Sequence, residues 1–114
     1  MKDQIQILES LVTHLPETNS ARSISQLNTV LTRYTAILNY VNSYNAECKR
    51  ATTLYYNDIT NIRDYIQESL YSFTSHQQEI ALRKARKELE TDIKALALLI
   101  EGQMQYQLEA LPVA

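Results

Sequence analysis

The residues of this chain that could carry chemistry do not fall at the spacings that catalytic or metal sites require. A carboxylate-bridged di-metal site in a helical protein needs Glu three positions before an inward-facing His. Here Leu11 stands three positions before His14, and Phe73 stands three positions before His76. Cys48 is the single cysteine, has no histidine near it in sequence and keeps the register of the apolar residues, so we expect a buried, unreactive thiol. We therefore predict a protein that is not an enzyme and that uses no metal and no cofactor.

Acidic residues form a second group of candidates. Asp58, Asp64 and Glu68 could form an acidic patch on one helical segment. Asp64 and Glu68 stand four positions apart, and two like charges at this spacing are most simply explained as exposed side chains of one helix face. We expect no site at these residues.

One basic cluster could contact phosphates or an acidic partner. Its cations are Arg83, Lys84, Arg86 and Lys87. Acidic residues stand four positions from three of them, in the pairs Glu79–Arg83, Lys84–Glu88 and Arg86–Glu90. This spacing favours ion pairs on a solvated helix surface, and the net charge of −2 gives no general attraction to polyanions. Nucleic-acid binding through this cluster is therefore the alternative rather than the leading hypothesis.

Helices must position all of these residues. From Glu17 to Glu101 the sequence contains neither glycine nor proline, so it lacks the residues that make tight turns. We predict an all-α fold: an antiparallel helical bundle or a long helical hairpin of three to four helices, with dimerisation as a further way to complete it. With 114 residues, the chain is expected to form a single all-helical domain over residues 1–114.

Apolar spacing predicts the bounds of the helices. A short helix over residues 3–14 ends before Pro16, a long helical segment covers 22–73, and a last helix covers 76–110. The long segment repeats its apolar residues every three and four positions, as a coiled coil does. Low helix propensity within 42–58 leaves two alternatives, one bent helix or a break. The apolar seam of its second half consists of Tyr55, Ile59, Ile62, Ile66, Leu70 and Phe73.

Local signals mark two helix starts and one uncertain end. Ser23-x-x-Gln26 has the pattern of a capping box, and Thr74-x-x-Gln77 overlaps with Ser75-x-x-Gln78 where the apolar pattern resets. After Gly102 the helical spacing of apolar residues continues, which favours continuation of the last helix over an extended tail.

The segment 23–46 contains one charged side chain, Arg33. Opposite its apolar seam lies a stripe of small polar residues, and surfaces of monomers usually carry about a quarter to a third charged residues. We therefore expect this face to be covered by a protein partner or by a second copy of the chain; the alternative is a solvated face of Thr and Asn. Tyr40 and Tyr56 lie off the seam and are added as contact candidates. The predicted interaction surface is Asn28, Thr32, Thr35, Asn39, Tyr40, Asn42 and Tyr56.

These features predict a helical protein-protein interaction module that is oligomeric: an adaptor, an assembly factor, a chaperone or a small inhibitor of a larger protein. The alternative is a helical accessory or inhibitor protein of a nucleic-acid-processing machine, with contacts through residues 83–87. No membrane association is expected, because the longest apolar run, residues 95–100, is far below the ~20 residues of a membrane span. Polar residues near the start and the single cysteine favour a cytoplasmic location.

Overall fold

The computed structural model of the chain describes residues 2–18 and 22–110, with side chains as far as Gln105. These residues form four helices and no strand: α1 (Lys2–Thr13), α2 (Arg22–Asn42), α3 (Ala46–Leu70) and α4 (Ser75–Ala110). The predicted all-α class is confirmed. No helix in the described part of the chain combines the length and the apolar content that a membrane crossing needs.

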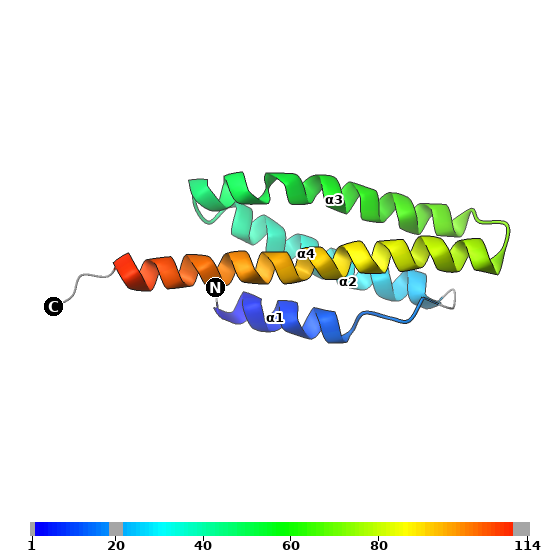
Figure 1. The fold of residues 1–114 in the computed structure, drawn as a ribbon, viewed down its shortest axis with the longest axis horizontal. Helices are drawn as coiled ribbons and strands as arrows, with labels where there is room; N and C mark the ends of the chain where they lie inside the picture. Colours follow the sequence, from blue (N-terminus) through cyan, green and yellow to red (C-terminus); the bar gives the residue numbers. More distant parts are fainter. Residues whose placement is uncertain (1, 19–21, 111–114) are drawn as a thin grey trace.

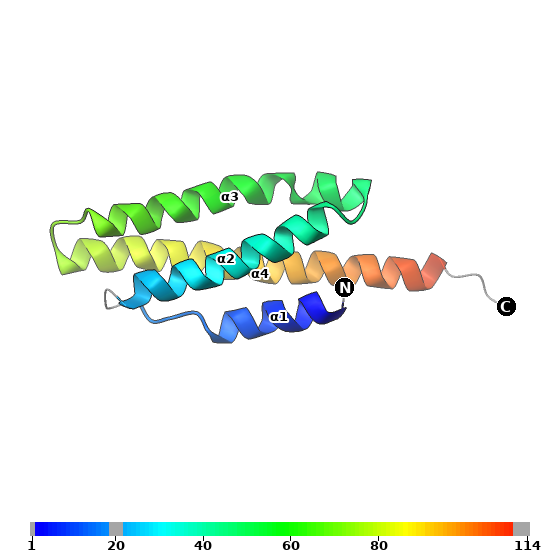
Figure 2. The same cartoon turned by 180° about the vertical axis from the view of Figure 1, so that it is seen from behind.

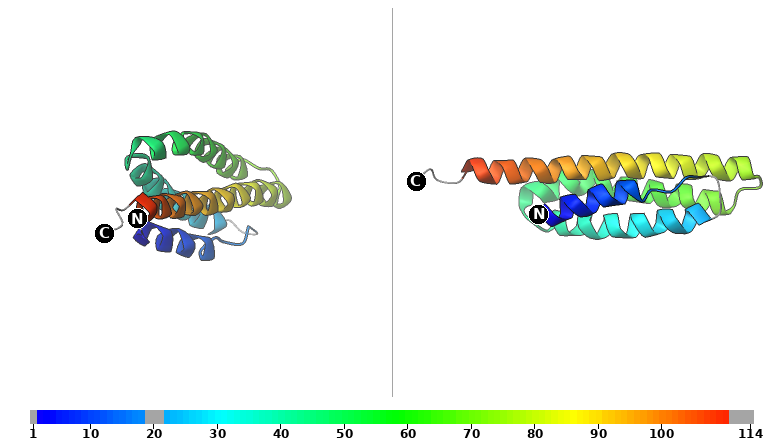
Figure 3. Two further views of the ribbon diagram at one scale, coloured as in Figure 1. Left: turned by 60° about the vertical axis from the view of Figure 1, so that its left-hand side comes forward. Right: turned by 90° about the horizontal axis from the view of Figure 1, so that it is seen from below.

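The longest helix, α4, packs against each of the other three helices. Figure 1 shows α3 on one side of α4 and α1 on the other, and Figure 2 shows α2 crossing the opposite face of the molecule. The carboxyl-terminal part of α4 extends beyond the other helices (Figure 3). The molecule is therefore elongated, with extents of 64 × 24 × 16 Å.

The segment expected over 22–73 is two helices, because the chain reverses direction at residues 43–45. Asn45 has extended backbone angles, and its side-chain oxygen accepts a hydrogen bond of 2.8 Å from the backbone N–H of Cys48. This is the geometry of a helix N-cap, which supplies a partner for an otherwise unpaired donor. Of the two alternatives for 42–58, the break is the one observed.

The other local signals have different outcomes. Thr74 caps α4, because its hydroxyl accepts a hydrogen bond of 3.1 Å from the backbone N–H of Gln77. Ser23 is not an N-cap, since it lies inside α2 and its hydroxyl donates to the carbonyl oxygen of Glu17. Gly102 is helical, so α4 continues past it, as the apolar spacing favoured.

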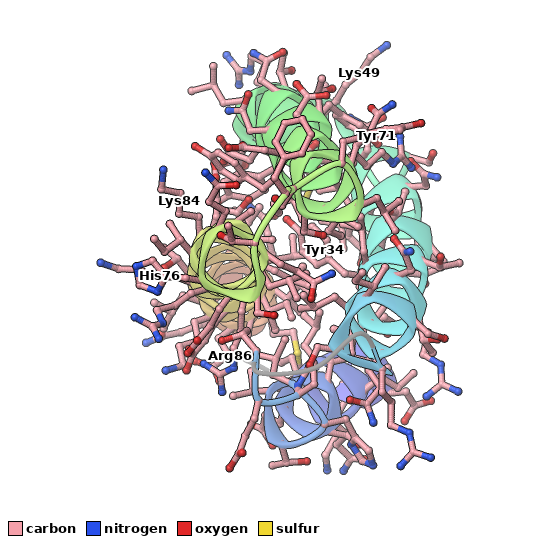
Figure 4. All side chains as sticks on the ribbon, turned by 90° about the vertical axis from the view of Figure 1, so that its right-hand side faces the viewer. Tyr34, Lys49, Tyr71, His76, Lys84 and Arg86 are labelled. Carbon is pink, nitrogen blue, oxygen red and sulfur yellow. The ribbon has the colours of Figure 1, made fainter. Side chains whose placement is uncertain are left out.

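Side chains from all four helices form one apolar core. Its largest fully buried members include Tyr34, Leu8, Leu38, Ile62 and Ile93. Figure 4 looks along the molecule and shows Tyr34 pointing into the space between the helices. Of the seam predicted for the second half of the long segment, Ile59, Ile62 and Ile66 are buried, but Leu70 and Phe73 are exposed. Phe73 lies beyond the end of α3, where helical spacing no longer decides where a side chain points, and Leu70 is the last residue of that helix.

Candidate interaction surface

The polar stripe of α2 is divided between contacts within the chain and solvent. Tyr56 on α3 donates a hydrogen bond of 2.8 Å from its hydroxyl to the Asn39 side-chain oxygen, and the Asn42 amide donates one of 2.9 Å to the Thr52 hydroxyl. The residues nearest the α2–α3 turn are therefore used in part to join these two helices. Asn28 and Thr32, farther from the turn, are exposed.

Threonine hydroxyls on this face are already hydrogen-bonded within α2. Thr29, Thr32 and Thr35 donate to the backbone oxygens four residues earlier, at 3.0, 2.8 and 2.7 Å. Hydroxyls that bond in this way no longer need a partner outside the helix. The methyl groups remain for outward contacts, so the face is less polar than its composition suggests.

An open groove of about 660 Å³ lies between the first half of α2 and the end of α3. Its lining consists of Ile24, Ser25, Asn28, Thr29, Thr32 and Arg33 from α2 and of Leu70 from α3. Arg33 is the single charged residue of that lining, and among the described residues it forms no ion pair. The groove therefore contains two of the predicted contact residues, Asn28 and Thr32.

The α3–α4 turn presents three large apolar side chains next to this groove, and we call Leu70, Tyr71 and Phe73 the aromatic tip. Their exposed fractions are 58%, 74% and 98%. Figure 4, which views this end, shows Tyr71 on the outside of α3. Glu68 lines a smaller hollow of about 310 Å³ together with Tyr71 and Phe73. The tip was not predicted from the sequence, although residues directly before the Thr74 cap are expected to lie in a turn.

The basic cluster is mostly engaged within the chain. Arg83 pairs with Glu79 at 2.7 Å, and Arg86 pairs with Glu90 at 3.2 Å, as predicted. Arg86 also donates a hydrogen bond of 2.9 Å from Nε to the carbonyl oxygen of Pro16, which ties α4 to the segment after α1 (Figure 4).

The predicted Lys84–Glu88 pair is absent from the ion pairs of the described residues. Lys84 lies instead over the ring of Tyr65, with its Nζ 5.9 Å from the ring centre. Lys87 is exposed. Two of the four cations are therefore neutralised by partners on α4, and a third is held against an aromatic ring.

Buried polar groups gather between α2, α3 and α4. Asp92 is only 6% exposed, and its Oδ2 has no hydrogen-bond partner among the described residues; the same holds for the hydroxyl of fully buried Tyr34. Burial raises the pKa of Asp92 to about 7, with further contributions from Asp58, which is within hydrogen-bonding reach, and from Glu88. The pKa of Tyr34 is raised as well, first by burial and then by Asp92. Asp92 was not predicted as a site residue, although it stands between Leu89 and Leu96 on the apolar seam of α4.

This arrangement can hold a proton but shows no assembled catalytic centre. No group of three potential ligands in residues 2–18 and 22–105 is placed to hold a metal ion. Cys48 is buried, as predicted, and its pKa is raised first by burial and then by Glu47, which disfavours the thiolate that acts as the nucleophile.

No family model, curated protein or solved structure matches this chain.

Proposed function

We propose that this chain is a non-enzymatic helical-bundle module that binds a protein partner, either a different protein or a second copy of itself, through the α2 face, whose one charged residue is Arg33, and the aromatic tip. Within this class it serves as an adaptor, an assembly factor, a chaperone or a small inhibitor. The cytoplasmic location stays a prediction from the sequence.

The observation that carries this proposal is the aromatic tip. Single exposed apolar side chains are common on protein surfaces, but three adjacent ones beside an open groove are typical of a contact site. Tyrosine and other aromatic residues are also enriched among those that contribute most to binding. Phe73 is 98% exposed and contributes almost nothing to the core, so packing within this chain does not explain it.

The α2 face supports the same proposal. Its threonine hydroxyls are bonded within the helix, so a partner can cover the methyl groups without leaving these hydroxyl donors unpaired. The basic cluster gives the nucleic-acid alternative less support than the α2 face gives the protein-binding proposal, because Arg83 and Arg86 are paired with Glu79 and Glu90.

The test compares three forms of the tagged chain in affinity capture from the native host: wild type, Phe73→Ser and Leu98→Ser. Leu98 is 68% exposed on α4 and is the matched control, since each substitution removes one exposed apolar side chain. We expect the capture to yield a protein that, once purified, binds the purified wild type and the purified Leu98→Ser variant. Its affinity for Phe73→Ser should be weaker by about tenfold or more. Equal binding by all three forms, or no protein that rebinds after purification, would contradict the proposal.

A further inference from the structure

The groove and the aromatic tip are contiguous, because Leu70 belongs to both. One end of the molecule therefore carries a protruding part, with Phe73 as its most exposed residue, directly beside a hollow of about 660 Å³. A surface patch that holds both a projection and a hollow can match a copy of itself across a twofold axis.

The charges at this end are also self-complementary. Arg33 is the charged residue of the groove, and Glu68 lines the hollow at the tip. Neither residue takes part in an ion pair within the described ranges. When the tip of one copy enters the groove of another, opposite charges approach each other at two symmetry-related places. Like charges would oppose such docking, so this complementarity favours a second copy as the occupant.

We propose that two copies of this chain form a twofold dimer in which the aromatic tip of each copy lies in the α2–α3 groove of the other. Phe73 is the central apolar contact, and Arg33 of each copy pairs with Glu68 of the other. This inference deepens the proposed function, on which it rests, by naming the protein that covers the contact surface.

The first experiment is sedimentation equilibrium of the untagged full chain over roughly 1–100 µM. We expect a dimer for wild type and for the control Leu98→Ser, and at least about tenfold weaker association for Phe73→Asp. A wild type that remains monomeric at the highest concentration, or a Phe73→Asp dimer of unchanged affinity, would overturn the inference.

The second experiment exchanges the charges. Arg33→Glu and Glu68→Arg should each weaken the dimer, because each places like charges in contact, and the double variant should restore association close to the wild-type level. Both positions are exposed in the single chain, so the substitutions leave the core intact, as a far-ultraviolet circular dichroism melt can verify. A double variant that associates no better than either single variant would refute the pairing and with it the proposed arrangement.

The two proposals fail in different ways. A wild type that is monomeric at about 100 µM but binds a captured protein in a Phe73-dependent manner would overturn the dimer and support the interaction module. Anionic vesicles that bind wild type but not Phe73→Ser would overturn both, because the tip would then contact lipid.

Discussion

Asp92 on α4 lies within hydrogen-bonding reach of Asp58 on α3, in the interface between these two helices. Burial, followed by the nearby Asp58 and Glu88, raises the pKa of Asp92 to about 7, so Asp92 holds a proton below that pH. Tyr34 from α2, Tyr55 from α3 and Glu88 from α4 interact electrostatically with Asp92. Lys84 and Lys87 line the same surface hollow as Asp92.

The stability of the protein should therefore depend on pH in the range where this proton is lost. The pKa of Asp92 is raised from 3.8 to about 7 in the folded chain, so the folded state binds the proton more tightly than the unfolded state. The stabilising contribution is complete below the unfolded pKa and is lost as pH rises through 7. We expect the free energy of unfolding, measured by urea denaturation, to fall between pH 5 and 8 by at most about 3 kcal/mol. A free energy that rises over this range would contradict the buried proton.

Asp92→Asn should remove most of this pH dependence. The amide cannot ionise, and its N–H group can donate a hydrogen bond to the Asp58 carboxylate. We expect the free energy of unfolding of the variant, relative to that of wild type, to increase by about 2–3 kcal/mol between pH 5 and pH 8. The control is the substitution Asp64→Asn at an exposed position of α3. It should leave the change of the unfolding free energy with pH as it is in wild type. If the unfolding free energies of wild type and Asp92→Asn change with pH in parallel, the pH dependence arises from other groups.

Asn45→Ala should destabilise the chain by about 1 kcal/mol, because it removes the side chain that caps α3. The matched control is Asn57→Ala on an exposed surface of the same helix, where alanine has the higher helix propensity and should be neutral or slightly stabilising. Urea denaturation of both variants at pH 6 measures the difference. If the two substitutions have the same effect, the cap contributes nothing to stability.

Within the basic cluster, Arg86→Ala should be more harmful than Arg83→Ala. Arg86 is half-buried, pairs with Glu90 and bonds to the Pro16 carbonyl, so its loss should lower the free energy of unfolding by about 1–2 kcal/mol. Arg83 forms only an exposed pair with Glu79, and its loss should change stability by less than about 0.5 kcal/mol. Thermal and urea unfolding of the two variants compare them directly, and an equal effect would count against the Arg86–Pro16 contact as a structural tie.

The sequence predicted those parts of the fold that depend on local spacing. The helices follow from apolar repeats and from the scarcity of glycine and proline, and the Thr74 cap follows from its position three residues before Gln77. Weak helix propensity within 42–58 does not decide between a bend and the break at residues 43–45, because it does not reveal that Asn45 caps a new helix.

The candidate site was less predictable, because it depends on which helix lies beside which. The polar stripe of α2 was identified, but spacing could not show that Asn39 meets Tyr56 on the next helix. Leu70 continues the apolar spacing of α3, so only the position of the helix end reveals its exposure. Asp58 and Asp92 are far apart in sequence and approach each other only after α3 and α4 pack together.

The bonded threonines of α2 have a consequence for the thermodynamics of association. The hydroxyls of Thr29, Thr32 and Thr35 already have acceptors in their own helix. A molecule that binds over these threonines therefore removes mainly their methyl groups from water. Calorimetry of this binding should show a negative change in heat capacity, which is the signature of nonpolar surface leaving water.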